Sequence, residues 1–137
     1  YEYLPALIND WRSQWNDSNL PFLAVQLANF QDINLTPTES NWAVLRDAQL
    51  SASKIPNAAT IVTIDLGEWN DIHPLNKKDI GIRLSLAAKK LAYGENIVHS
   101  GPTLKSSKIE NDKIILDFDN VGSGIISNDG EKLRWFA

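Results

Sequence analysis

Two short, almost continuously apolar runs constrain the fold of this chain more than any other feature. They are Phe22 to Leu27 and Ala59 to Leu66, and the second is rich in β-branched residues. Continuous apolarity is typical of strands buried on both faces, as in parallel sheets. Because parallel strands are joined by long crossovers, usually helical, we expect an α/β fold with helices on both faces of a parallel sheet.

Three segments around these runs carry helix signals. Apolar residues recur at helical spacing from about Tyr3 to Trp15, which predicts an amphipathic helix with Trp11 and Trp15 in the core. A capping Thr, a Pro and a Glu within Thr36 to Glu39 predict the start of a second helix. Asn76 can cap a third helix. Helices and strands therefore alternate along the first part of the chain.

The pattern of residues changes after Val98. Short β-type runs follow one another, separated by turn-forming Asn, Asp, Ser and Gly residues: Leu104 to Ile109, Lys113 to Asp119, Ile125-Ile126, and Lys132 to Phe136. This pattern predicts an antiparallel β region. We therefore expect one domain in residues 1–98 and the start of another in residues 99–137.

Composition excludes several classes of partner. The net charge of −4, with Lys and Arg scattered among the 137 residues, gives no reason to expect nucleic acid or an anionic membrane surface. No apolar run approaches the roughly 20 residues that span a bilayer. The absence of Cys excludes disulfides and thiolate metal sites. Because the chain has no Met and begins at Tyr1, we expect it to derive from a longer protein.

The polar loop after the second apolar run is the strongest candidate for chemistry. Gly67 ends the run, and Asp71 and His73 follow on the loop. Pro74 biases His73 toward an extended backbone, and functional groups gather at the carboxyl ends of parallel strands. An imidazole beside a carboxylate suits general-base catalysis near neutral pH. An ordinary solvated turn would show the same two residues, so both interpretations stay open.

Other catalytic patterns are weak or missing. No Ser occurs in a Gly-x-Ser-x-Gly sequence, which argues against the nucleophile elbow of the α/β-hydrolases. His73 and His99 are the two histidines, and they lack the spacing of a zinc site. Asp117 and Asp119 alternate as on the solvated face of a strand, which is more common than a metal pair.

The longer string from Ile64 to Leu84, followed by Leu86-Ala-Ala and Tyr93-Gly, resembles the last catalytic block of the SGNH-type carbohydrate esterases. The resemblance is to the sialate O-acetylesterase and acetylxylan esterase-like group. Further segments resemble that group in the same order along the chain: Leu7 to Arg12, Pro21 to Gln26, Trp42 to Gln49, and Ser100-Gly-Pro102.

This resemblance implies a fold and a reaction. The fold would be part of a three-layer, flavodoxin-like SGNH-hydrolase sheet, with residues 1–98 as the carboxy-terminal part of the esterase domain and residues 99–137 opening an antiparallel β region or accessory domain. The reaction would be hydrolysis of acetyl esters on sugars through an acyl-enzyme. Nothing in this chain corresponds to the family's nucleophilic Ser or its oxyanion-hole Gly and Asn. We therefore expect the Ser upstream and the chain alone to be inactive.

The same resemblance assigns His73 as the catalytic base. Many SGNH enzymes place an Asp three residues before the His, where this chain has Asn70. Asp71 is therefore the first candidate for the carboxylate partner of His73, and Asp65 and Glu68 remain open, as does a Ser-His pair oriented by a backbone carbonyl. Such chemistry needs no metal or cofactor.

The expected partners follow from the incomplete domain. They are an O-acetylated sugar or glycan as substrate, and either the missing amino-terminal half of the esterase domain or a second copy of the chain. The family resemblance suggests a periplasmic or secreted location. A non-catalytic carbohydrate-binding or protein-interaction module is the alternative.

Overall fold

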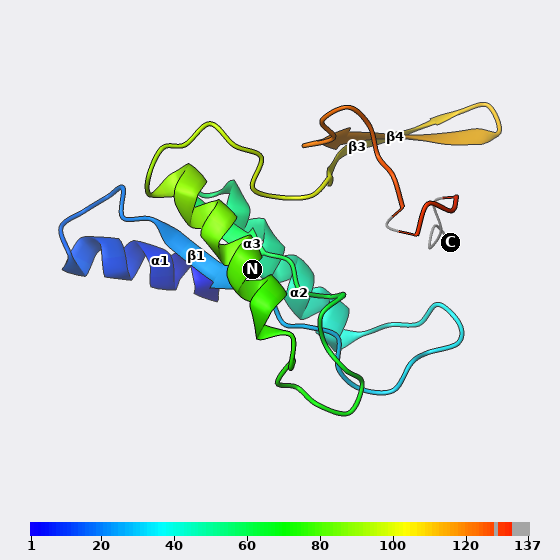
Figure 1. The fold of residues 1–137 in the computed structure, drawn as a ribbon, viewed down its shortest axis with the longest axis horizontal. Helices are drawn as coiled ribbons and strands as arrows, with labels where there is room; N and C mark the ends of the chain where they lie inside the picture. The colour runs from blue at the N-terminus through cyan, green and yellow to red at the C-terminus, as the bar shows by residue number, and fades with distance from the viewer. Residues whose placement is uncertain (128, 133–137) are drawn as a thin grey trace. The chain divides into compact units, whose positions relative to one another are not determined.

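The computed structural model describes residues 1–127 and 129–132. It contains two compact units, one spanning Tyr1–His99 and a second that begins at Ser100 (Figure 1). No helix in the described residues is both long enough and apolar enough to cross a membrane.

A two-stranded parallel sheet lies at the centre of the first unit. Strand β1 (Phe22–Val25) pairs in parallel with strand β2 (Ala58–Ile61). The crossover between them contains helix α2 (Asn41–Ser51) and a single 3₁₀ turn, η1 (Ala52–Lys54). This β1-α2-β2 unit confirms the predicted α/β fold with a parallel sheet.

Helices pack on both faces of this sheet, because alternate residues of β2 point in opposite directions. Helix α1 (Tyr3–Gln14) precedes the sheet and helix α3 (Lys77–Leu91) follows it. One core cluster contains Ile8 of α1, Ala52 of η1 and Ala58 of β2. The other contains Ala59 and Ile61 of β2 and Ala87 of α3. The sheet is therefore covered by α1 and η1 on one face and by α3 on the other.

Both strands are shorter than the apolar runs that predicted them. β2 ends at Ile61, and the remaining residues enter a turn in which the Leu66 N–H donates to the Thr63 carbonyl at 3.0 Å. β1 ends at Val25, where its partner β2 also ends; the Gln26 N–H still donates to the Ile61 carbonyl at 2.9 Å, and the Leu27 N–H bonds to the side chain of Gln49 at 3.0 Å. Beyond these residues neither strand has a paired neighbour, so the hydrogen-bonded pairing of β1 with β2 ends there.

The second helix begins later than Thr36. Its N-cap is Ser40, whose extended backbone lets the hydroxyl accept a hydrogen bond from the Ala43 N–H at 3.3 Å. Both Thr36 and Ser40 are good capping residues, and the sequence alone favoured the wrong one. The prediction for the third helix is confirmed, because Asn76 Oδ1 accepts from the Asp79 N–H at 3.2 Å.

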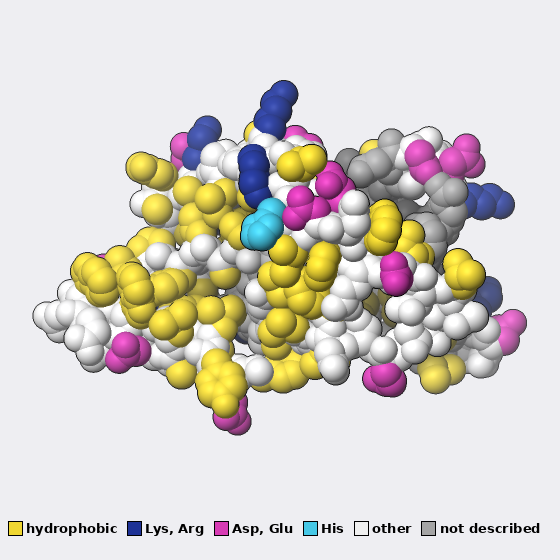
Figure 2. All heavy atoms as spheres, turned by 90° about the horizontal axis from the view of Figure 1, so that it is seen from below, with side chains coloured by type: hydrophobic (Ala, Val, Ile, Leu, Met, Phe, Trp, Pro, Cys, Tyr) yellow, Lys and Arg dark blue, Asp and Glu magenta, His cyan; other side chains and the backbone are white. Residues whose placement is uncertain are grey.

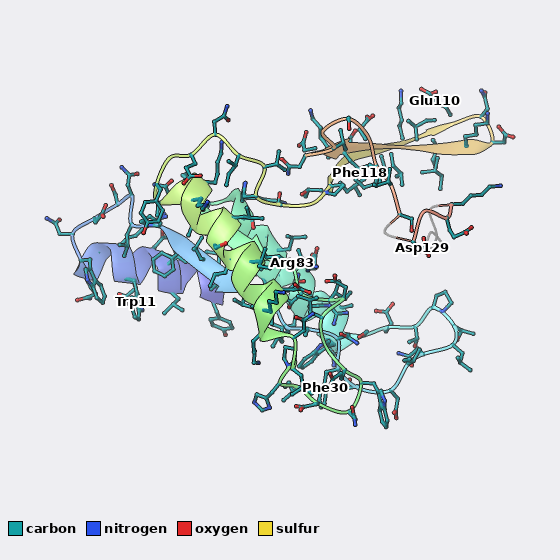
Figure 3. All side chains as sticks on the ribbon, viewed as in Figure 1. Trp11, Phe30, Arg83, Glu110, Phe118 and Asp129 are labelled. Atoms are coloured by element: carbon teal, nitrogen blue, oxygen red, sulfur yellow. The ribbon has the colours of Figure 1, made fainter. Side chains whose placement is uncertain are left out.

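The predicted burial of two tryptophans in α1 is wrong. The exposed fractions are 45% for Trp11 and 60% for Trp15, and their rings stack on each other with centroids 4.9 Å apart (Figure 3). Arg12 is buried in their place, with 8% exposed. Its guanidinium donates to the Leu20 carbonyl at 3.0 and 3.1 Å and to the Pro56 carbonyl at 2.8 Å. These bonds offset the cost of removing the charge from water.

The second unit contains an antiparallel hairpin, as predicted. Strand β3 (Thr103–Glu110) pairs with strand β4 (Lys113–Asp119), and Asn111 takes a positive φ of 55° in the turn between them. The residues at Ile125-Ile126 form no strand, which corrects that part of the prediction. The predicted run from Lys132 to Phe136 lies, beyond Lys132, outside the described residues.

Candidate active site

The loops that leave the carboxyl ends of β1 and β2 lie against each other. A Cβ atom at Gly67 would be 2.5 Å from the backbone oxygen of Asn29 and 2.6 Å from its Oδ1, so only glycine fits this contact. The Gln31 N–H also donates to the Trp69 carbonyl at 2.8 Å. Strand pairing therefore places the loop that carries Asp71 and His73 directly beside the loop that follows β1.

A buried hydrogen-bond network connects the starts of these loops with β2 and with α2. The Gln26 side chain donates to the Arg46 carbonyl at 2.9 Å, and the Thr63 hydroxyl donates to the Gln26 carbonyl at 2.6 Å. On the neighbouring helix, Gln49 accepts from the Leu27 N–H through its side chain, and its carbonyl accepts from the Thr60 hydroxyl at 2.7 Å. These bonds connect α2 to β2 and to the start of the loop that follows β1.

The structure brings His73 and Asp71 together on the second loop. Asp71 Oδ1 accepts the His73 backbone N–H at 2.8 Å and lies 3.5 Å from His73 Nδ1. The first bond closes a local turn, and the second distance is longer than a good N–H···O bond. The imidazole is 85% exposed and the carboxylate 43%. His73 therefore presents its ring to the surface, with a negative charge beside it.

Asp65, an alternative partner for His73, is occupied by Arg83 of α3. Its two carboxylate oxygens accept from the two guanidinium NH₂ groups at 2.7 and 2.6 Å, and Arg83 also donates to the Val62 carbonyl at 2.7 Å (Figure 3). The hydrogen bond from Arg83 lowers the pKa of Asp65, and the same bond raises the pKa of Arg83. This bidentate pair attaches the start of the loop to α3.

Glu68, the other alternative, faces a different environment. Its backbone carbonyl accepts from the Asp71 N–H at 3.3 Å, and its side chain lines a pocket. The carboxylate has no hydrogen-bond or ion-pair partner among the described residues. Of the three carboxylates considered from the sequence, Asp71 thus lies in contact with His73, Asp65 is paired elsewhere, and Glu68 is unpaired.

The pocket lies between the two loops and the start of α2. It has a volume of about 520 Å³ and is lined by residues 29–34, residues 67–70, Ser40, Trp42 and Arg46. Phe30 and Trp42 form one wall, with ring centroids 5.7 Å apart (Figure 3). The Trp42 indole N–H donates to the Ala28 carbonyl at 2.8 Å, which fixes that wall. Sequence reasoning missed this pocket, because its two sides are far apart in the chain.

Large apolar side chains are exposed elsewhere on the first unit. They include Trp11, Trp15, Leu35, Leu75 and Tyr93, with exposed fractions from 45% to 97%. Figure 2 shows apolar side chains gathered in patches on the surface. Single exposed apolar residues are ordinary, whereas gathered ones are typical of surfaces that bind another chain.

The chain resembles known esterases in both sequence and structure, although no family model matches it. It is 34% identical over 122 residues to sialate O-acetylesterase of Mus musculus, which covers 77% of this chain and 22% of that protein. The Homo sapiens sialate O-acetylesterase is 32% identical over 116 residues, covering 72% of this chain and 22% of that protein.

A crystal structure of a carbohydrate acetylesterase from Xanthomonas citri matches with a TM-score of 0.77 and 45% sequence identity, over 83% of this chain and 26% of that one. The chain thus spans about a quarter of the length of the proteins it matches. Agreement in sequence and in structure confirms the resemblance predicted from the motifs: this chain is related to the SGNH-type carbohydrate esterases.

Proposed function

We propose that this chain supplies the catalytic histidine of a carbohydrate O-acetylesterase, and that His73 is that residue. The observation that carries the proposal is the exposed imidazole at the carboxyl end of a parallel strand, with the Asp71 carboxylate 3.5 Å from Nδ1. The chain's relatives are named sialate O-acetylesterase and carbohydrate acetylesterase, which supports an acetylated sugar as the substrate.

In the proposed reaction, His73 first acts as a base. Its imidazole takes the proton from a Ser hydroxyl while the Ser oxygen bonds to the acetyl carbon. The imidazolium then gives that proton to the sugar oxygen as the ester C–O bond breaks. A water molecule then gives a proton to the same imidazole as its oxygen bonds to the acetyl carbon of the acetyl-enzyme. The bond from that carbon to the Ser oxygen breaks, the imidazolium returns the proton to the Ser oxygen, and the released acetic acid ionises to acetate. The Asp71 carboxylate stabilises the imidazolium formed in each half of the reaction.

The geometry ranks the three candidate carboxylates. Asp71 is favoured because one of its oxygens lies near His73 Nδ1. The bidentate pair with Arg83 argues against Asp65, since both of its oxygens already accept hydrogen bonds. Glu68 keeps an unpaired carboxylate on the same loop, and it remains the second candidate.

We propose that the nucleophilic Ser and the oxyanion hole come from a segment outside this sequence. The absence of the corresponding motifs here supports this, as does the share of the relatives that the chain covers, about a quarter. In this proposal residues 1–98 complete an esterase domain, and residues 99–137 begin an accessory β region. The exposed apolar side chains of the first unit would contact the remainder of that domain or a second copy of the chain.

The test compares His73→Ala with the unchanged protein, in a longer form that contains the proposed Ser segment. Suitable esters are 4-nitrophenyl acetate, O-acetylated N-acetylneuraminic acid and an acetylated xylo-oligosaccharide. Loss of a triad base costs turnover on the order of 10⁴ to 10⁶-fold. Near-normal turnover of all three esters by His73→Ala would end the proposal. The alternative of a non-catalytic binding module predicts no turnover by either protein.

A further inference from the structure

The pocket between the two loops carries polar side chains that have no partner within the chain. Arg46, Asp32 and Glu68 line it, and none of these three makes a side-chain hydrogen bond or ion pair among the described residues. Asn29 lines it too, and its buried Oδ1 accepts no hydrogen bond there. Arg46 and Glu68 are half-buried, whereas Asp32 is exposed. Polar groups that are shielded from water normally find partners, because leaving them unpaired is costly. The pocket therefore presents unused donors and acceptors together.

The mixture of groups identifies the kind of ligand. Arg46 offers only donors, whereas Asp32 and Glu68 offer only acceptors. Two carboxylates against one guanidinium leave the pocket with a net negative charge, so it gives a carboxylate or phosphate ligand no overall attraction. A hydroxyl group both donates one hydrogen bond and accepts two. A neutral, hydroxyl-rich ligand can thus satisfy all three side chains.

An aromatic ring completes the lining. Trp69 lines the pocket with 56% of its surface exposed, and it packs against no other aromatic ring in the described residues. Phe30 and Trp42, in contrast, pack on each other and form a fixed wall. A free indole face can pack against the apolar C–H face of a sugar ring. The volume of about 520 Å³ is in the ordinary range for small-molecule pockets.

The pocket lies close to His73. Its lining ends at Asn70, three residues before His73. Since consecutive Cα atoms are about 3.8 Å apart, the two Cα atoms are separated by at most about 11 Å. One acetylated sugar can therefore place its ring in the pocket and its ester near the imidazole.

We propose that this pocket is the subsite for the uncharged, hydroxyl-bearing part of the sugar substrate, with Trp69 as the stacking surface and Arg46 as a hydrogen-bond donor. This inference rests on the proposed esterase function and adds the residues that select the sugar. Neither Trp69 nor Arg46 takes part in the proton transfers. Both bind the substrate, so their loss affects sugar esters more than an ester without a sugar.

The experiment compares Trp69→Ala, Trp69→Phe and Arg46→Met in the longer protein. For each variant, kcat/KM is measured with the acetylated xylo-oligosaccharide and with 4-nitrophenyl acetate, and the ratio of the two values is taken. Losing one well-packed contact in a pocket typically costs about 10-fold or more in specificity. We expect the ratio to fall by about that factor in Trp69→Ala and Arg46→Met, and to be restored in large part in Trp69→Phe.

A matched control and a binding measurement complete the test. Trp15→Ala removes a similarly exposed Trp at the C-cap of α1, 60% exposed against 56% for Trp69, and it should leave the ratio unchanged. Equal losses on both esters in Trp69→Ala would overturn the subsite, because Trp69 would then only support the loop. Calorimetric binding of xylotriose to the protein, weakened by Trp69→Ala, supports the subsite even if neither ester is hydrolysed. Absence of xylotriose binding overturns it even if His73 proves catalytic.

Discussion

Asp71 Oδ1 lies between two groups of His73, accepting the backbone N–H at 2.8 Å while standing 3.5 Å from Nδ1. One oxygen therefore both closes the turn and lies beside the ring. Structural and electrostatic roles of Asp71 coincide in a single atom, so a substitution must separate them before either can be measured.

Asp71→Asn separates the two roles. The Asn side-chain oxygen can still accept the His73 N–H and keep the turn, but the negative charge beside the imidazolium is lost. We expect turnover to fall by less than the loss on the order of 10⁴ to 10⁶-fold expected for His73→Ala. Steady-state kcat with 4-nitrophenyl acetate measures the difference. Glu68→Gln is the comparison variant, and a larger loss there than in Asp71→Asn would make Glu68 the partner of His73.

Gly67→Ala should displace the loop that carries His73. The added Cβ would lie 2.5 Å from the Asn29 backbone oxygen, which cannot move aside as a flexible side chain could. Overpacking of this kind typically costs about 1–3 kcal/mol of unfolding free energy. Urea unfolding measures this cost.

Gly81→Ala is the matched control for that experiment. Gly81 lies within α3, and a Cβ there would meet nothing within 4 Å. Replacing a helical Gly by Ala typically stabilises a protein by about 0.5–1 kcal/mol. Opposite signs for the two Gly→Ala variants are expected, and equal effects would refute the close contact between the two loops.

Arg12→Met should destabilise the first unit. The substitution keeps part of the buried aliphatic length but leaves the Leu20 and Pro56 carbonyls without their donor. A fully buried group left unsatisfied costs about 1–3 kcal/mol. Because the bonds to these two carbonyls are only partly buried, we expect a loss of about 1–3 kcal/mol in total in thermal or urea unfolding. Lys89→Met removes an exposed charge from α3 and serves as the control, with little change expected.

The Asp65–Arg83 pair should give a stability difference that depends on pH. Because the pKa of Asp65 is lowered in the folded state, its ionised form contributes stability above the unfolded pKa of about 3.9, and that contribution is lost as the pH falls through the folded pKa. The pair is partly exposed, so Asp65→Asn should cost no more than about 1 kcal/mol at pH 7. Unfolding of both proteins at pH 7 and at pH 2.5 measures the difference, which should shrink at the lower pH.

Local patterns in the sequence were enough to predict the three helices, the parallel pairing and the hairpin. Periodicity and capping act within a few residues, so Asn76 correctly marked the start of α3. The lengths of the strands were wrong because a strand ends where its paired neighbour turns away, and the neighbour of β1 is far along the chain, where β2 ends at Ile61. Helical spacing alone could not show that Arg12, and not Trp11, is buried, since its acceptors lie on two loops.

The candidate site also combines features set by nearby residues with features set by residues far along the chain. Asp71 and His73 are near neighbours in sequence, and the motif placed them on one loop. Asp65 looked equally available, because its partner Arg83 lies on a helix 18 residues away. The pocket needs the β1 and β2 loops side by side, so Arg46 and Trp69 stood only in two separate segments that resemble the esterases, and nothing showed that the two residues line one pocket. A polar loop leaving the carboxyl end of β1 was the one clue to that pocket in the sequence.

The stacked indoles of Trp11 and Trp15 also have a spectroscopic consequence. Two parallel indole rings with centroids 4.9 Å apart and planes 10° apart couple their electronic transitions. Such a pair gives circular dichroism that neither ring would give alone, and its fluorescence responds to any chain that covers it. The stacked pair is therefore an intrinsic spectroscopic probe at α1. Binding of a partner to that helix can be followed through it without a label.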